Sequence, residues 1–140
     1  MWGVRWSGQS VWRCTARSEV WNPSRVTLEA YRRLRAAPGY TPEIDLVAVA
    51  SDGVFASYCI CWLDPANRTG EFEPVGTRPA YQRQGFGRAV IAESLRRLKA
   101  RGATDATVLT PQSNERGVAL YESVGFHVAG SEYDYVKELS

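Results

Sequence analysis

Two apolar stretches separated by an Asp-Gly pair restrict most strongly what this chain can fold into. The stretches DLVAVAS and VFASYCICWL lie on either side of Asp52-Gly53, and Asp-Gly between apolar runs is a strong signal of a β-hairpin. The next stretch, GEFEPVGT, predicts a third strand that contains Pro74. Because proline has no N–H to donate to a neighbouring strand, we expect a bulge or a break in pairing at that point.

A glycine-rich turn and an amphipathic helix follow these strands. The turn, YQRQGFGRAV, places Gly85 and Gly87 at the start of the helix, and Gly102 suits its end. One face of the helix is apolar and consists of Val90, Ile91, Leu95 and Leu98. The remainder predicts a strand at ATVLT, a short helix at about Asn114 to Ser123 closed by Gly125, and a final hairpin made of GFHVAG and YDYVKEL.

The N-terminal part of the chain gives weaker signals. WGVRW permits a first strand that is either brief or missing altogether. A helix is predicted over Val11 to Val20, and Ser24 can cap a second helix that stops before Pro38. Together these elements predict a mixed α/β (α+β) fold in one domain spanning residues 1–140.

Composition excludes several classes of protein. The formal net charge of +2 is too small to indicate a general nucleic-acid or membrane surface, and no apolar run approaches the ~20 residues of a membrane span. The three cysteines, Cys14, Cys59 and Cys61, cannot all pair within one chain. Cys59 and Cys61 alternate along a predicted strand, so we expect reduced thiols packed on one face of a cytoplasmic protein. No metal site is predicted, because the single histidine, His127, is far away in sequence.

Three phosphate-binding motifs can be compared with the glycine turn. A P-loop requires GxxxxGK[ST], which is absent. The Rossmann pattern GxGxxG fails because Val90 takes the third glycine position and Asp105 stands at the wrong end of the next strand. The pattern Q/R-x-x-G-x-G/A is matched by Gln82, Gly85 and Gly87. Successive N–H groups exposed at a helix start bind anions, and glycine lets a pyrophosphate lie against the main chain.

The stretch from Glu71 to Phe126 resembles the GNAT acetyltransferase superfamily, which moves an acetyl group from acetyl-CoA to an amine. Two motifs in the right order carry the resemblance, VGTRPAYQRQGFG and NERGVALYESVGF. The second departs from the family's N-x-x-A-x-x-L-Y-x-x-x-G-F pattern at Gly117, where alanine is more usual, and it matches at Asn114, Leu120, Tyr121, Gly125 and Phe126. The resemblance implies the GNAT fold, a mixed and mostly antiparallel sheet flanked by helices, with acetyl-CoA as cosubstrate.

The resemblance also implies which residues bind the cofactor. The main-chain N–H of Val75 would face the acetyl carbonyl, Thr77 would lie along the pantetheine arm, and Asn114 would cap its helix or hydrogen-bond the pantetheine. The pyrophosphate would be held by the main chain of the glycine turn, which comprises Gln82, Arg83, Gln84, Gly85, Phe86, Gly87 and Arg88.

Proton transfer has several candidates. By resemblance, the phenol of Tyr121 would protonate the departing CoA thiolate. Glu71 stands where some members of the family carry a general-base glutamate, Glu73 is the alternative two residues on, and a water chain is the third possibility. His127 is interpreted as a structural or surface residue, which leaves no convincing nucleophile and fits direct attack by the amine.

The acceptor amine and the partners remain open. The aromatic residues that could line an acceptor pocket are Trp12, Trp21, Tyr31, Tyr58 and Trp62. Aromatic residues more often serve as buried packing. A missing first strand would leave a sheet edge open and predicts a homodimer. The main alternative is a non-catalytic acyl-CoA-binding or sensing domain on the same scaffold. A lesser alternative is a nucleic-acid-binding module that uses the arginine-bearing helix.

Overall fold

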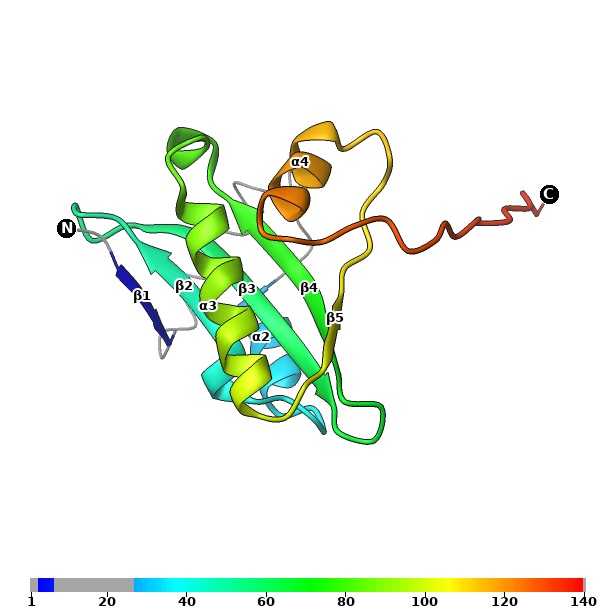
Figure 1. Ribbon diagram of the computed structural model, residues 1–140, viewed down its shortest axis with the longest axis horizontal. Coiled ribbons are helices and arrows are strands. Elements are labelled where there is room, and N and C mark those ends of the chain that lie inside the picture. Colours follow the sequence, from blue (N-terminus) through cyan, green and yellow to red (C-terminus); the bar gives the residue numbers. More distant parts are fainter. Residues whose placement is uncertain (1–2, 7–26, 140) are drawn as a thin grey trace.

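The structure is a computed structural model that describes residues 3–6 and 27–139. The described strands form one five-stranded sheet in the order β1-β2-β3-β4-β5, antiparallel except for the parallel β4–β5 pair (Figure 1). In chain order the elements are β1 (Gly3–Trp6), α2 (Leu28–Arg35), the 3-10 turn η1 (Pro42–Ile44), β2 (Asp45–Val49), β3 (Phe55–Asp64), β4 (Thr69–Thr77), the 3-10 turn η2 (Pro79–Tyr81), α3 (Phe86–Ala100), β5 (Asp105–Thr107) and α4 (Glu115–Ser123).

The hairpin predicted around Asp52-Gly53 is confirmed. β2 and β3 pair antiparallel, and the turn between them is closed by hydrogen bonds from the Ala50 N–H to the Val54 carbonyl and from the Gly53 N–H to the Ala50 carbonyl. The Oδ1 of Asp52 accepts from the Val54 N–H at 3.0 Å, which is the local bond that favours aspartate at such a turn.

The predicted irregularity at Pro74 is also confirmed. Cys59 faces Val75 and Cys61 faces Phe72, so the register of β3 against β4 shifts between them. One β3 residue, Ile60, therefore lies opposite the two residues that precede Val75, which is the geometry of a β-bulge.

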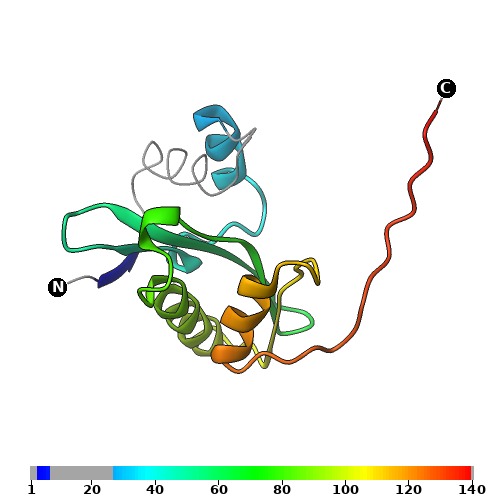
Figure 2. The ribbon, with the colours of Figure 1, turned by 90° about the horizontal axis from the view of Figure 1, so that it is seen from above.

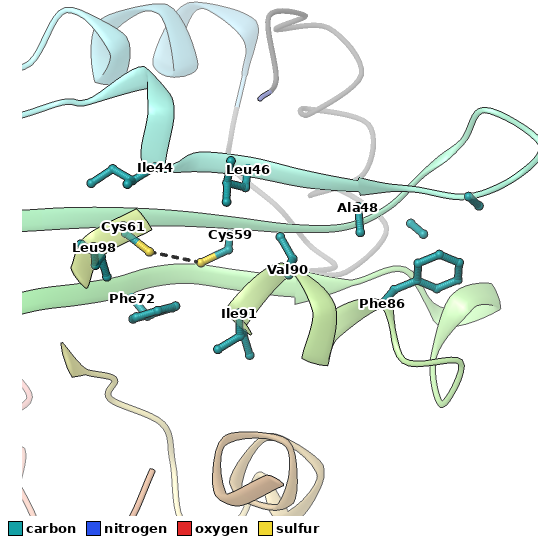
Figure 3. Close-up of a cluster of buried hydrophobic side chains, with 12 residues drawn as sticks. Ile44, Leu46, Ala48, Cys59, Cys61, Phe72, Phe86, Val90, Ile91 and Leu98 are labelled. Atoms are coloured by element: carbon teal, nitrogen blue, oxygen red, sulfur yellow. Dashed lines mark hydrogen bonds between the residues drawn. The ribbon is translucent and has the colours of Figure 1, made fainter. Parts of the chain in front are cut away.

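Helices cover both faces of the sheet (Figure 2). α3 and α4 lie on one face and α2 lies on the other. α3 contacts β2, β3 and β4, and the apolar face predicted for it is buried or half-buried. The core beneath it (Figure 3) is built from alternate residues of three strands and the inner face of α3: Leu46, Ala48, Cys59, Cys61, Phe72, Phe86, Val90, Ile91 and Leu98.

Cys59 and Cys61 point to the same face, as predicted, and are free thiols buried in this core. Their sulfur atoms are 3.5 Å apart (Figure 3), well beyond the ~2.05 Å of a disulfide bond. The hydrogen bond to Cys59, together with burial, raises the pKa of the Cys61 thiol above its ordinary value. Cys61 is therefore a packed, protonated group. Cys14 lies outside the described residues.

α2 is attached to the sheet through a buried carboxyl group. Asp45, the first residue of β2, is fully buried. The phenols of Tyr31 on α2 and Tyr40 after it both donate to Oδ2 of Asp45 at 2.5 Å. A buried carboxyl is costly without such donors, so these bonds fix where α2 and the loop after it lie.

The remaining predictions agree with the structure only in part. Of the two alternatives for the first strand, brief or missing, the brief strand is confirmed, since β1 pairs with β2. α2 is capped by Thr27, whose Oγ1 accepts from the Ala30 N–H; Ser24 and the helix predicted over Val11 to Val20 lie outside the described residues. The strand predicted at ATVLT is wrong in its bounds, because β5 ends at Thr107 where its pairing with β4 ends.

The predicted C-terminal hairpin is wrong. Residues 126–139 form neither helix nor strand, and they extend away from the sheet (Figure 1). Within the described residues, no helix combines the length and the apolarity needed to cross a membrane.

Candidate functional site

β4 has a strand on both sides for only the first part of its length. Its pairing with β5 runs from Thr69 to Glu71, whereas its pairing with β3 continues to Thr77. Beyond Glu71, no described strand pairs with the β4 edge that faces away from β3. A peptide-like group can bind to such an edge as an added strand would. Val75, which the family resemblance implies would face the acetyl carbonyl, lies on this segment and is half-buried.

The N-terminus of α3 follows this part of β4 in the chain after the short turn η2. Gly85 is the cap residue, and no side chain caps the helix, whereas Thr27 caps α2 and Asn114 caps α4. The first N–H groups of a helix have no acceptor within it, so the main chain at this helix start, which includes Gly87 and Arg88, can bind an anion. Gly85 has a φ of +87°, a conformation that favours glycine, and the turn therefore requires this residue.

Gly87, the second glycine of the turn, is required for a different reason. A Cβ on Gly87 would lie 3.1 Å from Cδ2 of Leu120 and 3.1 Å from Oγ1 of Thr77, so Gly87 permits close packing of α4 and β4 against the start of α3. The hydroxyl of Thr77 is also 3.0 Å from Oγ of Ser57. Thr77 therefore lies beside the helix start with its hydroxyl already in a hydrogen bond.

The turn before α3 is held by contacts that the sequence analysis did not identify. The Tyr81 phenol donates to Oδ2 of Asp52 in the β2–β3 turn at 2.6 Å. The Tyr81 and Phe86 rings meet edge to face with centroids 5.8 Å apart, and Arg116 of α4 donates to the side-chain oxygen of Gln82 at 3.2 Å. No local pattern reveals these links, because the partners are far apart in sequence.

The positive charges around this helix start are exposed. Arg83 and Arg88 on the turn and helix, and Arg116 on α4, are all exposed, so they can approach a bound anion from the rim. Gln84 donates its side-chain amide to the Ala80 carbonyl at 3.0 Å, which stabilises the turn itself. The main chain supplies the inner surface of the site and the arginines supply charge around it.

Tyr121 lies on α4, half-buried against the core. Its ring meets that of Phe126 edge to face at 5.9 Å, and the Phe126 ring meets Phe72 of β4 at 5.7 Å. Burial, and to a lesser extent the nearby Cys59, raises the pKa of Tyr121 to about 12. The phenol is therefore protonated at neutral pH. Asn114 caps α4 as predicted, with Oδ1 accepting from the Gly117 N–H at 3.1 Å.

The two glutamates of β4 are both exposed and alternate with the buried Phe72. Glu71 lies opposite Trp62 of β3 and lines an open groove on the α2 side together with Pro38, Gly39, Trp62, Leu63, Asp64, Asn67, Thr69 and Thr107. Glu73 does not line this groove; its carbonyl accepts from the Trp62 indole N–H at 3.0 Å. Glu71 and Glu73 thus occupy different positions relative to the groove.

The described aromatic residues considered for an acceptor pocket fall into two groups, those buried in the fold and one that lines the groove. Tyr31 and Tyr58 are buried at 4% and 2% exposure, which places them in the packing of the fold. Trp62 lines the groove and meets the Tyr40 ring edge to face at 6.3 Å. Trp12 and Trp21 lie outside the described residues.

Comparison with known proteins decides the family. The profile described as "Acetyltransferase (GNAT) family" matches residues 9–126, which is most of the chain. The chain belongs to this family. A mycothiol acetyltransferase from Kineococcus radiotolerans is 32% identical over 111 residues, covering 79% of this chain and 35% of that protein. The ribosomal protein bS18-alanine N-acetyltransferase of Escherichia coli K12 is 38% identical over 61 residues, covering 44% of this chain and 41% of that protein.

Solved structures confirm the GNAT fold. The structure of AAC(6')-Iy in complex with the bisubstrate analogue CoA-S-monomethyl-acetylneamine matches with a TM-score of 0.80 at 16% identity over 99% of both chains. The ribosomal-protein-S18-alanine N-acetyltransferase from Escherichia coli matches with a TM-score of 0.76 at 20% identity, over 93% of this chain and 80% of that one. This GNAT chain spans about a third of the length of the mycothiol acetyltransferases that it matches.

The link between Tyr81 and Asp52 predicts a measurable pKa change. The hydrogen bond from Tyr81 is the main reason that the pKa of Asp52 lies below its ordinary value. In Tyr81→Phe we expect the pKa of Asp52 to rise toward its ordinary value, because the largest cause of the lowering is removed. The pH titration of the Asp52 carboxyl carbon in NMR spectra measures the change.

Asp64 is the internal control for this experiment. Its pKa is lowered mainly by the side chain of Asn67, which Tyr81→Phe leaves in place, so its titration should stay the same. An unchanged titration of Asp52 in the variant would show that the Tyr81 bond does not hold the turn in solution.

Proposed function

We propose that this GNAT chain is an N-acetyltransferase that moves an acetyl group from acetyl-CoA directly to an amine. The observation that carries the proposal is the uncapped N-terminus of α3, with Gly85 at a φ of +87°, which follows the part of β4 that pairs with β3 alone after the short turn η2. An anion-binding helix start and a free strand edge are the two surfaces that a pyrophosphate joined to a peptide-like arm requires.

The residues named from the sequence divide the binding between them. The main chain from Gln82 to Arg88 would hold the pyrophosphate, with the exposed Arg83 and Arg88 adding charge at the rim. The pantetheine arm would lie along β4 past Thr77. Thr77 would contribute main-chain contacts, because its hydroxyl is already in a hydrogen bond with Ser57. The amide of Asn114 already bonds within its own loop and cap, to Thr110 and Gly117, so its first role is to position α4.

Two groups would act on the reacting thioester. A main-chain N–H of Val75 directed at the carbonyl oxygen would stabilise the charge that develops there, an effect worth roughly 3 kcal/mol where single donors have been removed. Tyr121 would donate a hydrogen bond to the departing sulfur. With the Tyr121 pKa at about 12 and a thiol at ~8.5, full proton transfer costs about 5 kcal/mol. Tyr121 therefore stabilises the developing thiolate more than it supplies its final proton.

The amine must lose a proton before it attacks, and Glu71 is the better placed carboxylate. It lines the groove on the α2 face beside Trp62, at the last β4–β5 pair. Glu73 does not line the groove, and a water chain remains the alternative route. We infer that the acceptor amine approaches through this groove. The acceptor itself is unidentified. The relatives include mycothiol acetyltransferases and a ribosomal-protein alanine acetyltransferase, and the compounds in these names are chemically different.

Gly85→Glu tests the pyrophosphate site. We expect a loss of acetyl-CoA binding of at least about 10²-fold, because the side chain adds a negative charge beside the helix start and the positive φ disfavours it. Isothermal titration calorimetry with acetyl-CoA measures the change. Ala92→Glu, which places the same charge on an exposed position of the same helix, is the matched control and should bind like the parent. Equal binding by both variants would remove this site.

Tyr121→Phe tests the leaving-group role. Acetyl-CoA consumption over a panel of amines should show kcat reduced by about 10²-fold, with the dissociation constant for acetyl-CoA unchanged because the ring still packs on Phe126. Turnover equal to that of the parent would contradict the assignment. Binding of acetyl-CoA without turnover of any amine by the parent protein would favour the alternative, a non-catalytic acyl-CoA-binding domain.

Glu71→Gln and Glu73→Gln form a matched pair that tests the base. With an accepted amine from the panel, we expect Glu71→Gln to lower kcat/KM by about 10²-fold and Glu73→Gln to leave it within about twofold, since only Glu71 lines the groove. The reverse result would make Glu73 the base. If both variants keep the activity of the parent, a water chain would remove the proton of the amine.

A further inference from the structure

Trp62 of β3 makes a side-chain contact with the bulge of β4. Its indole N–H donates to the Glu73 carbonyl at 3.0 Å. Glu73 is the residue before Pro74, and among the described strands neither of the two has a partner in the register with β3 or with β5. Main-chain groups outside a ladder bond to side chains or to water, and here a side chain of the neighbouring strand is a donor. The bulge is therefore held by Trp62 as well as by the pairs on either side of it.

A second contact fixes the position of the indole. The Trp62 ring meets the Tyr40 ring edge to face, with centroids 6.3 Å apart. The Tyr40 phenol donates to Oδ2 of the buried Asp45 at 2.5 Å. The Glu73 carbonyl is thus connected, through two aromatic rings, to a buried carboxyl group at the start of β2.

The bulge lies next to the main chain that is proposed to act on the thioester. Val75, whose N–H is the proposed donor to the acetyl carbonyl, is two residues beyond Glu73. A bulge bends its strand and increases the local twist, so its geometry sets the direction of the main-chain groups that follow. Because a hydrogen bond weakens steeply when it is misaligned, a contact that fixes the Glu73 carbonyl also controls how well Val75 can donate.

Trp62 also lines the groove through which the acceptor amine is proposed to approach. It lies directly opposite Glu71 in the register of β3 against β4. One side chain therefore borders the path of the amine and holds the main chain that is proposed to face the thioester.

We propose that Trp62 is a positioning residue for acetyl transfer, whose indole N–H holds the β4 bulge so that the Val75 N–H is directed at the thioester carbonyl. This inference rests on the proposed function. Loss of the indole N–H slows the chemical step and leaves the affinity for acetyl-CoA unchanged, because the pyrophosphate site is the separate start of α3. Trp62 acts through the main chain of β4 and does not itself touch the reacting atoms.

Nuclear magnetic resonance of the protein without cofactor tests the hydrogen bond itself. The indole N–H signal that disappears in Trp62→Phe is the signal of Trp62. In the parent, this N–H should exchange with solvent more slowly than the N–H of free tryptophan. Exchange as fast as that of free tryptophan overturns the proposal, whatever the variant does.

The infrared carbonyl stretch of bound acetyl-CoA, labelled with carbon-13 at the acetyl carbonyl, tests the positioning without turnover. A hydrogen bond to a carbonyl oxygen lowers its stretching frequency. We expect a lowered frequency in the parent complex and a return toward the value of free acetyl-CoA in Trp62→Phe, which keeps an aromatic ring and lacks the N–H. Trp6→Phe makes the same substitution in β1, which does not pair with β4, and should keep the frequency of the parent. Equal frequencies in the parent and Trp62→Phe overturn the proposal.

Kinetics separates positioning from acceptor binding. At saturating acceptor, kcat of Trp62→Phe should fall about tenfold or more, because the donor is misplaced, while the dissociation constant for acetyl-CoA stays within about twofold. Far-ultraviolet circular dichroism confirms that the variant is folded. A raised KM for the amine with kcat unchanged would show that Trp62 serves acceptor binding alone and overturns its positioning role.

The two proposals fail in different ways. A parent that binds acetyl-CoA and shows the Trp62-dependent carbonyl shift, but acetylates no amine, contradicts the proposed function and supports the positioning by Trp62. A parent that acetylates an amine with the same kcat and carbonyl frequency as Trp62→Phe contradicts the positioning alone. A parent that does not bind acetyl-CoA overturns both.

Discussion

The incomplete pairing of β4 is the constraint on which the rest of this structure depends. Its partnership with β5 stops at Glu71, while its partnership with β3 continues past the bulge to Thr77. A strand that keeps one neighbour and loses the other presents main-chain groups at an edge next to a packed core. The same strand leads through η2 into the uncapped start of α3, so the free edge and the anion-binding helix end are consecutive in the chain.

The sheet also separates the two halves of the proposed chemistry. Tyr121 and α3 lie on the face that buries the apolar core, where low solvent access raises the pKa of the phenol. Glu71 and Trp62 line an open groove on the α2 face, where the proposed acceptor amine would stay hydrated until it reaches the strand. Attack at the border between β4 and β5 would join the two. The bonds of Tyr31 and Tyr40 to Asp45 fix the α2 side of this arrangement.

Local chemistry explains why some predictions succeeded. Asp-Gly between apolar runs specifies a hairpin through bonds made within a few residues, and Pro74 removes one donor wherever its strand lies, so both signals are independent of the rest of the chain. Asn114 caps its helix for the same reason. The predicted final hairpin is wrong, because a local pattern of apolar and polar residues does not specify whether a neighbouring strand is present to pair with, and residues 126–139 form neither helix nor strand.

The sequence by itself determined the order of strands and helices from β2 to α4, the bulge, the glycine turn and the GNAT motifs, because each rests on backbone preferences or on residues close together in the chain. Only the tertiary structure decided that Gly87 serves packing against Leu120, that Tyr81 ties the turn to Asp52, and that Glu71 rather than Glu73 lines the groove. These facts depend on contacts between residues distant in sequence, and such contacts exist only once the sheet has set their positions.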